Sequence, residues 1–248
     1  MGNKRGETLT LENNENTQFI GMLVAVFTIF ITLVVFAVWR RRRSVGRSLI
    51  LAGLSNAGKT LLYARLLHSK YVATHTSVKE NIGDVTINNS ALRIVDIPGH
   101  ERLRQKFFDN YKSSIRGLVY VIDSVTIQKD VRDVAEYLYT LLSDPTIQKN
   151  GTPVLILCNK QDQTTAKGCS VIKSLLEKEI NLLRVTKTNQ LETTDASSSN
   201  FYLGKQGKDF EFIHLGSKVD FAEASAFDKD SETSADIEQL DIWLQKIA

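Results

Sequence analysis

The sequence predicts a three-layer α/β fold with a mostly parallel six-stranded sheet, preceded by one N-terminal transmembrane helix. Three observations predict this fold. A glycine-rich phosphate-binding motif, Gly53 to Thr60, lies between an apolar run and a helical pattern. Further apolar runs alternate with helical patterns to the end of the chain. An uncharged apolar stretch, Phe19 to Trp39, precedes all of them.

The composition sets broad limits on the protein. The chain has 248 residues, 42% of them hydrophobic, which suffices for one domain of ordinary size. Its formal net charge of +3 comes largely from the run Arg40 to Arg43, so we expect no direct nucleic-acid binding. Cys158 and Cys169 are the two cysteines and form no C-x-x-C motif. A disulfide framework is therefore not expected, and both thiols suit a reducing compartment.

The N-terminal region predicts a membrane anchor. Residues 1–18 are polar and form a short lumenal tail, and Phe19 to Trp39 follows with 21 uncharged residues. At ~1.5 Å per residue this helix spans about 31 Å, which matches a hydrocarbon core of about 30 Å. A cleavable signal peptide or a buried core helix are the alternatives, but a signal peptide usually has a shorter apolar core. The arginines in the basic juxtamembrane linker, residues 40–47, favour a cytosolic domain over residues 48–248, whereas a nuclear signal or solvated tail is the alternative for them.

The first strand and helix of the domain enclose the phosphate-binding motif. Leu49 to Ala52 reads as a buried strand and Lys59 to Leu67 as a helix, so the motif G-x-x-x-x-G-K-[ST] has the context it needs. Lys59 would reach the β- and γ-phosphates, and the Thr60 hydroxyl would bind Mg²⁺. An ordinary glycine turn is the alternative. The nucleotide-binding residues expected here are Gly53, Leu54, Ser55, Asn56, Ala57, Gly58, Lys59, Thr60 and Leu61.

A second acidic contact is expected after the next pair of strands. Val78 to Asn88 and Ala91 to Ile97 read as a hairpin around the turn Asn88-Asn89-Ser90. The turn spells a glycosylation sequon, which a cytosolic domain leaves unused. Asp96 opens a D-x-x-G motif and would hold Mg²⁺ through water, while the Gly99 N–H would contact the γ-phosphate. A simple turn is the alternative for this motif.

The next segments predict a guanine-reading loop. Glu101 to Ser114 and Lys129 to Leu142 read as helices, and Gly117 to Ile122 and Pro153 to Cys158 read as buried strands. The last strand runs into the motif N-K-x-D, whose carboxylate can accept hydrogen bonds from both N1–H and the 2-amino group of guanine. A surface turn is the alternative. The base-reading residues expected here are Asn159, Lys160 and Asp162.

The C-terminal part is less regular. Ala166 to Ile180 reads as a helix, and residues 184–215 read as an irregular insert in which Lys208 to Phe212 alternates like a short edge strand. Lys218 to Glu223 is the last strand and leads into Ala224-Ser225-Ala226. Asp236 to Ile247 reads as an amphipathic helix. Backbone groups of Ser225 and Ala226 would contact the guanine edge.

Together these motifs resemble a small Ras-like GTPase. The closer resemblance is to the beta-subunit family of the eukaryotic signal recognition particle receptor, and it covers nearly the whole chain. It rests on the N-terminal span and on GLSNAGKT, THTSV, VDIPGHERLR, KSSIRGLVYVIDS, LGKQGKDFEF and KVDFAEASA. No ordinary GTPase motif requires LGKQGKDFEF, Leu203 to Phe212, so this stretch distinguishes subfamilies.

The resemblance implies a single-pass protein of the endoplasmic reticulum membrane that binds GTP, GDP and Mg²⁺. Its implied partner is the N-terminal domain of the receptor's alpha subunit, which it holds at the membrane when loaded with GTP; ribosome and translocon are further candidate partners. Two other functions stay open: an Arf- or Sar-like trafficking GTPase that recruits coat or tether proteins, and a GTP-bound structural anchor with little hydrolysis. The N-K-x-D motif argues against a P-loop kinase.

The resemblance also assigns individual residues. Thr76 corresponds to the Mg²⁺-binding threonine of the first switch, with Thr74 as the alternative, and Ser77 lies beside it among the nucleotide contacts. His100 follows Gly99 where many GTPases carry glutamine, so it would orient the attacking water in a slow GTPase reaction; a surface histidine of little effect is the alternative.

Overall fold

The computed structural model describes residues 22–34, 46–192, 203–227 and 235–248. It divides into two units, Met1–Val45 and Gly46–Ala248. In the first unit, residues 22–34 form a helix. The predicted lumenal tail and most of the basic linker lie outside the described residues, as do both ends of the predicted span Phe19 to Trp39. Among the helices that are described, none has the length and apolar character needed to cross a membrane.

The second unit is built on a six-stranded sheet with the strand order β2-β3-β1-β4-β5-β6. β2 and β3 pair antiparallel, and every other neighbouring pair is parallel. This confirms the predicted mostly parallel α/β sheet. The strands are β1 (Ser48–Ala52), β2 (Asn81–Ile87), β3 (Ser90–Asp96), β4 (Ile115–Asp123), β5 (Val154–Asn159) and β6 (Val219–Glu223).

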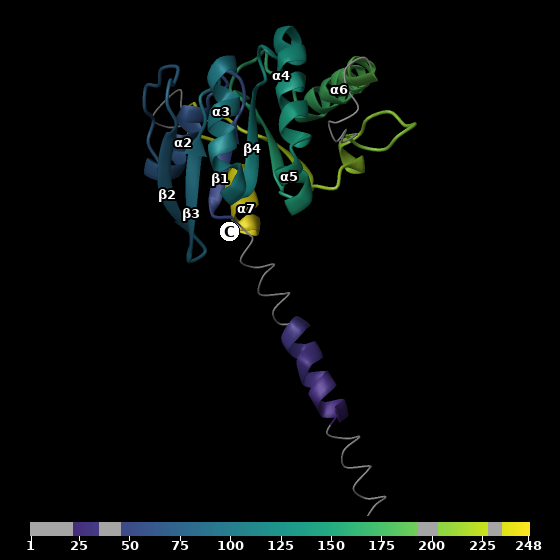
Figure 1. Cartoon of the computed structure of the whole chain (residues 1–248). Helices are drawn as coiled ribbons and strands as arrows, with labels where there is room; N and C mark the ends of the chain where they lie inside the picture. The colour runs from purple at the N-terminus through teal and green to yellow at the C-terminus, as the bar shows by residue number, and fades with distance from the viewer. Residues whose placement is uncertain (1–21, 35–45, 193–202, 228–234) are drawn as a thin grey trace, which may run out of the picture. The chain divides into compact units, whose positions relative to one another are not determined.

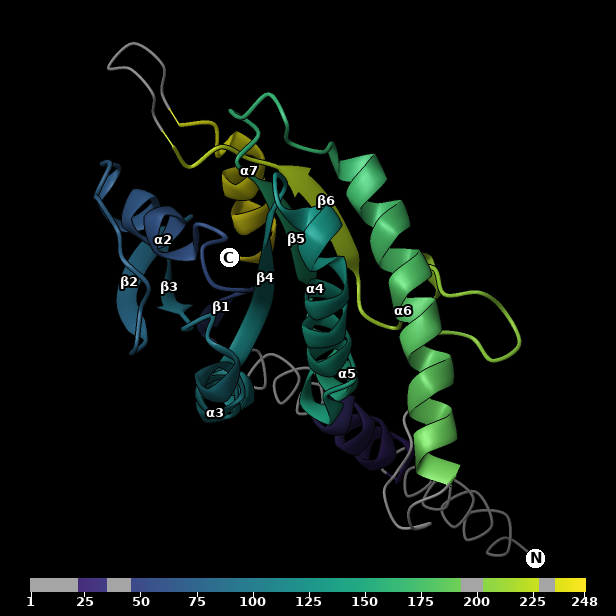
Figure 2. The same cartoon turned by 90° about the horizontal axis from the view of Figure 1, so that it is seen from above.

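Helices cover both faces of this sheet, as Figures 1 and 2 show. α2 and α7 pack on one face, and α3, α4, α5 and α6 pack on the other. The helices are α2 (Lys59–His68), α3 (Glu101–Tyr111), α4 (Ile127–Leu142), α5 (Pro145–Asn150), α6 (Cys169–Glu192) and α7 (Glu238–Ile247), with short 3₁₀ turns at Lys112–Ser114 and Phe212–His214.

The central strand shows why the sequence folds into three layers. All five residues of β1 are buried. Leu49 and Leu51 point into the core under α2 and α7, whereas Ile50 and Ala52 point into the core under α3 and α4. A strand buried on both faces reads as a continuous apolar run, which is the pattern seen in the sequence. The phosphate-binding motif that follows β1 therefore starts from a rigid, fully covered strand.

The hairpin of β2 and β3 closes as predicted at the asparagine pair. Asn88 and Asn89 have φ values of 50° and 60°, in the left-handed region that both central residues of a tight hairpin turn require. Asparagine tolerates this region better than most residues. The register runs from Ile87 opposite Ser90 to Asn81 opposite Asp96. The hairpin thus delivers Asp96 to the carboxyl edge of the sheet.

The predicted irregular insert needs two corrections. α6 continues to Glu192, so the irregular structure predicted from Arg184 is wrong over residues 184–192; residues 193–202 lie outside the described part. Leu183 and Arg184 are buried there, so packing extends the helix. Lys208 to Phe212 is not a strand either. The Phe210 N–H donates to Asn181 of α6 and the Phe212 N–H to Glu177, so side chains of α6 replace a neighbouring strand.

Candidate nucleotide-binding site

A cavity of about 520 Å³ lies at the carboxyl edge of the sheet, where β1, β3 and β5 end. Its volume falls in the range of small-molecule sites, and a carboxyl edge is where open α/β sheets bind ligands. The cavity combines the phosphate-binding motif, the segment after α2 and the base-reading motif. Its lining residues are Ser55, Asn56, Gly58 to Leu61, Tyr71 to Ser77, Ile97 to Gly99, Asn159, Lys160, Asp162, Gln163, Ala226 and Phe227.

The phosphate-binding loop depends on glycine at two positions. Gly53 has φ +143°, and a Cβ there would lie 2.2 Å from the Val121 carbonyl oxygen of the neighbouring strand. Gly58 has φ +93°, and its Cβ would lie 2.3 Å from Nδ2 of Asn159. Asn56 also adopts a left-handed conformation, with φ 64°. A loop that mixes such conformations turns successive backbone N–H groups inward, which suits an anion at the start of α2.

Lys59, the first residue of α2, is the charged group of the phosphate end. Its Nζ donates to the Leu54 carbonyl oxygen at 2.7 Å, and only 6% of its surface is exposed. Burial lowers the pKa of Lys59 to about 8, and the nearby Asp96 carboxylate opposes that shift in part. A buried ammonium with little compensating charge gains strongly from an added anion. The phosphates of a nucleotide would supply that charge.

A cation site is formed around Asp96 at the end of β3. Thr60 Oγ1 and Asn81 Nδ2 both donate to Oδ2 of Asp96, at 2.7 and 2.9 Å. Ser77 Oγ lies 3.1 Å from Thr60 Oγ1. Burial raises the pKa of Asp96, and the hydrogen bonds from Asn81 and Thr60 oppose the shift. Oδ1 of Asp96 is buried and has no hydrogen-bond partner among the described residues.

These groups fit Mg²⁺. A buried carboxylate oxygen without a partner, next to two hydroxyls, offers the hard oxygen ligands that Mg²⁺ prefers. The described residues contain no group of three or more acidic, histidine or cysteine side chains able to hold a metal. The remaining ligands would therefore come from phosphate and water, as is usual for nucleotide-bound Mg²⁺.

At the other end of the cavity, Asn159 links three loops. Its Nδ2 donates to the Ala57 carbonyl oxygen at 2.8 Å, and its Oδ1 accepts from the Ala226 N–H at 3.1 Å. The side chain is buried. The phosphate and base ends of the site are therefore held at a fixed separation by one amide.

Asp162, the predicted guanine reader, is oriented from both sides. Ser225 Oγ donates to its Oδ1 at 2.9 Å, and Gln163 Nε2 donates to its Oδ2 at 2.8 Å. Asp162 lines the cavity, so its carboxylate lies where the N1–H and 2-amino edge of a guanine could donate to it. The sequence predicts a backbone contact between Ser225 and guanine. In the structure, the Ser225 side chain also orients the Asp162 carboxylate.

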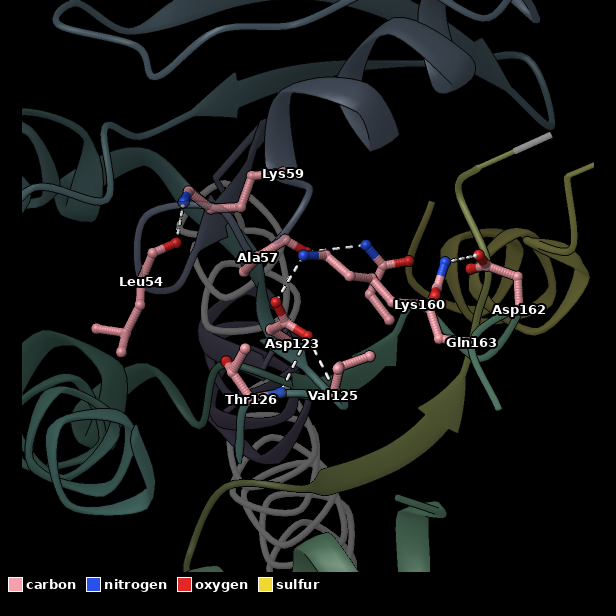
Figure 3. Close-up of polar contacts among 10 residues, drawn as sticks. Leu54, Ala57, Lys59, Asp123, Val125, Thr126, Lys160, Asp162 and Gln163 are labelled. Atoms are coloured by element: carbon pink, nitrogen blue, oxygen red, sulfur yellow. Dashed lines mark hydrogen bonds and ion pairs between the residues drawn. The ribbon is translucent and has the colours of Figure 1, made fainter. Parts of the chain in front are cut away.

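Lys160 has a strained backbone, with φ 68°. A left-handed conformation costs a residue with a Cβ roughly 1–2 kcal/mol. Its Nζ pairs with Oδ2 of Asp123 at 2.6 Å, and Oδ1 of Asp123 accepts from the Val125 and Thr126 N–H groups, as Figure 3 shows. Strain of this kind persists where the surroundings fix it and clusters at ligand sites.

The structure brings most predicted site residues to the cavity and gives the others supporting positions. Thr74, Thr76 and Ser77 all line it, and Ser77 is the one within hydrogen-bond distance of Thr60. His100 does not line it. This side chain is exposed and caps α3, where its Nδ1 accepts from the Arg102 N–H at 3.3 Å. The predicted residues that lie behind the lining are Gly53, Leu54, Ala57, Asp96 and Ser225.

The sequence did not predict the contributions of Asp123, Asn81, Tyr71 and Phe227 to the site. Asp123, which pairs with Lys160, directly follows the predicted strand Gly117 to Ile122, and an acidic residue just after a buried strand, at the ligand-binding edge of the sheet, is a signal that could have found it. Asn81 carries no such signal, because its contact with Asp96 depends on the register of the hairpin. Tyr71 and Phe227 both line the cavity and stack edge to face at 5.6 Å, a contact between residues far apart in the chain.

Comparison with known proteins identifies the family. The chain matches the profile described as "Signal recognition particle receptor beta subunit" over residues 44–219. The human signal recognition particle receptor subunit beta is 45% identical over 234 residues, which are 92% of this chain and 86% of the human protein. The chain belongs to the signal recognition particle receptor beta subunit family. This confirms the resemblance drawn from the sequence.

Two further comparisons place the receptor beta subunit family among GTPases. The solved "Structure of the Mammalian SRP Receptor" contains a chain 44% identical to this one with a TM-score of 0.72; the match covers 82% of this chain and 100% of that one. ADP-ribosylation factor-like protein 5A of Bos taurus is 30% identical over 138 residues, or 56% of this chain and 73% of the bovine protein. The Arf-like relationship therefore covers about half of the chain, whereas the receptor family covers most of it.

Proposed function

We propose that the chain binds GTP and GDP together with Mg²⁺ in the cavity at the carboxyl edge of the sheet. One observation carries this proposal: the Thr60 hydroxyl, which donates to the buried Asp96 behind it, and the oriented carboxylate of Asp162 line the same cavity. The first suits Mg²⁺ with phosphate, and the second suits guanine.

Selectivity for guanine can be tested at Asp162. The full chain is titrated with GTP, inosine triphosphate and ATP, since inosine lacks the 2-amino group and adenine lacks N1–H as a donor. Wild-type chain should bind GTP best, and Asp162→Asn should lose most of that preference. Asp209→Asn, which changes a carboxylate outside the cavity, is the matched control. An unchanged GTP preference in Asp162→Asn would show that another group reads the base.

As a member of its family, the chain serves as the GTPase subunit of the signal recognition particle receptor in protein targeting. In this role, GTP would order the segments 71–79 and 96–104, of which residues 71–77 and 97–99 line the cavity, and create the surface that binds the receptor's alpha subunit. Pull-downs with the full chain loaded with a GTP analogue or GDP test this. Enrichment of the alpha subunit only with the analogue supports the proposal, and equal enrichment in both states rejects a nucleotide-gated interface. Recovery of coat or tether proteins instead would favour a trafficking role.

Slow hydrolysis with His100 orienting the attacking water is the further proposal for this site. His100 directly follows Gly99, which lines the cavity. His100→Asn is the informative change, because asparagine is a good helix cap but cannot act as an imidazole. Single-turnover hydrolysis should slow in His100→Asn while the melting temperature stays near that of the wild type. Unchanged hydrolysis would leave His100 as a cap of α3 only, and negligible turnover of the wild type even with the alpha subunit present would favour a GTP-bound structural anchor.

Membrane anchoring by residues 19–39 in the endoplasmic reticulum, with the domain cytosolic, completes the proposal. The uncharged run followed by Arg40 to Arg43 supports it. The sequon at Asn88 is a built-in reporter of topology, because only a lumenal domain would be glycosylated there. Expression in microsomes should give a carbonate-resistant, unglycosylated chain that added protease cleaves. Glycosylation at Asn88 would reverse the proposed orientation.

A further inference from the structure

Two thiols meet beside the base-reading loop. Cys158 lies near the end of β5, and Cys169 is the first residue of α6. Their sulfur atoms are 3.3 Å apart. Cys158 is buried and Cys169 is partly exposed. They are the only two cysteines of the whole sequence, so any intramolecular disulfide of this chain must join them.

The short distance is set by the surrounding structure. The Cys169 N–H donates to Oε1 of Glu223 on β6 at 2.7 Å, which fixes the start of α6. Gln161 Nε2 donates to Ser124 Oγ and to the Lys167 carbonyl oxygen, both at 3.0 Å. These bonds draw the two ends of the segment 158–169 together. The thiols therefore face each other where the two ends of the loop that carries the N-K-x-D motif meet.

We propose that Cys158 and Cys169 are a modification site, which a hydroperoxide converts to a reversible intramolecular disulfide that slows the release of guanine nucleotide. The formation of the bond depends only on the two thiols. Its effect on release rests on the proposed nucleotide binding.

Cys169 is the attacking thiol. It lies at the start of a long helix, where backbone N–H groups favour the thiolate. The pKa of Cys169 is lowered by the hydrogen bond from Cys158, although burial and the charge of Glu223 oppose this. The same hydrogen bond and burial raise the pKa of Cys158. Exposure and thiolate character thus coincide at Cys169, and Cys158 is placed to resolve the product.

The chemistry with hydrogen peroxide balances in two steps. The Cys169 thiolate attacks one peroxide oxygen, the O–O bond breaks, and the leaving hydroxide takes a proton to become water. The resulting sulfenic acid is attacked by the Cys158 sulfur; the S–O bond breaks, and the Cys158 proton leaves with hydroxide as a second water. The two sulfurs lose two electrons, and one peroxide gains them. The sulfurs must close from 3.3 Å to about 2.05 Å.

The bond would restrain the base-reading loop. The ring closed by the disulfide contains Asn159, which is tied to the phosphate-binding loop, and Asp162, which lines the cavity. Release of a guanine requires these contacts to open locally. A covalent bridge between the two ends of the loop removes open conformations from the ensemble. The oxidised chain should therefore release nucleotide more slowly than the reduced chain.

The thiol chemistry is tested on the full chain in detergent micelles. After hydrogen peroxide and then catalase, we expect monomers that have lost two thiols and about 2 Da, both restored by dithiothreitol. Cys169→Ser, which changes the partly exposed partner, should leave Cys158 unoxidised, and Cys158→Ser should give a Cys169 sulfenic acid that dimedone traps. A sulfinic acid at Cys169 with Cys158 still a thiol, or disulfide-linked dimers, would overturn the proposal.

The effect on release is measured with a fluorescent GDP. We expect dissociation from the oxidised chain to be on the order of threefold slower and to recover with dithiothreitol. Peroxide-treated Cys169→Ser should match untreated wild type. A bridged chain that releases GDP at the reduced rate overturns the effect on release. A reduced chain that binds no GDP overturns the proposed function instead, and the thiol count remains an independent test of the bond.

Discussion

Gly58→Ala tests the contact between the phosphate-binding and base-reading loops. Gly58 has φ +93°, and a Cβ there would lie 2.3 Å from Nδ2 of Asn159. No carbon and amide nitrogen can approach so closely, so the Asn159 side chain must move. Moving it breaks its bonds to the Ala57 carbonyl and the Ala226 N–H. The substitution therefore combines backbone strain with the loss of an interloop tie.

The two costs can be separated in magnitude. The left-handed backbone alone costs alanine roughly 1–2 kcal/mol. The two lost hydrogen bonds, with their buried partners left unpaired, add roughly 2–4 kcal/mol. We expect Gly58→Ala to lower the free energy of unfolding by roughly 3–6 kcal/mol. In an Asn159→Ala background the amide is already absent, so the same change should cost only the strain.

The assay is urea unfolding of the full chain in micelles without nucleotide, followed by circular dichroism. Gly151→Ala is the matched control, because Gly151 has φ +57° and a Cβ added there would meet no other atom within 4 Å. It reports the strain alone. A loss of unfolding free energy in Gly58→Ala no larger than in Gly151→Ala would contradict the clash with Asn159. So would a loss that is the same within about 0.5 kcal/mol in both Asn159 backgrounds.

Two further predictions concern the phosphate end of the site. Because burial lowers the pKa of Lys59 to about 8 and bound phosphates would raise it, nucleotide binding at pH 8 should take up about half a proton, and affinity should fall by up to about tenfold per unit above that pH. Titration calorimetry in two buffers of different protonation enthalpy measures the proton uptake. Binding without proton uptake would contradict the proposed contact between Lys59 and the phosphates. Asn81→Ala removes a donor to Asp96 at 2.9 Å and should weaken Mg²⁺ binding to the GDP complex by about fivefold, or roughly 1 kcal/mol, with GDP affinity in EDTA unchanged. Asn150→Ala, at an exposed position, is its control. If Asn81→Ala weakened GDP binding in EDTA as much as it weakened Mg²⁺ binding, Asn81 would have a general structural role.

The sequence predicted those parts of the site whose chemistry is local. Gly53 to Thr60 carries its own strand, turn and helix, and the N-K-x-D motif follows a continuous apolar strand, so both could be placed without tertiary information. The hairpin turn at Asn88 was predictable for the same reason, because its conformation depends on the two asparagines themselves.

The parts that escaped prediction depend on partners distant in the chain. Lys208 to Phe212 alternates as a strand would, but its backbone N–H groups are satisfied by Asn181 and Glu177 of α6, which no local pattern reveals. The buried Phe210 and Phe212 rings contact each other edge to face at 5.1 Å, and Phe212 also contacts Phe221 of β6 at 5.1 Å, another partner distant in the chain. Asn81 likewise reaches Asp96 only through strand register. Hydrophobic periodicity predicts which face of a strand or helix a residue lies on, but it does not predict which distant residue that side chain contacts.

The link that Asn159 makes between loops has a consequence for how a ligand enters and leaves. The base-reading loop cannot move away from the phosphate-binding loop unless the Asn159 amide releases the Ala57 carbonyl oxygen. The segment 71–77 lines the same cavity and has a contact at each end, the Tyr71 ring against Phe227 and the Ser77 hydroxyl beside Thr60. Two separate sets of contacts, one on each segment, therefore limit how a ligand enters and leaves.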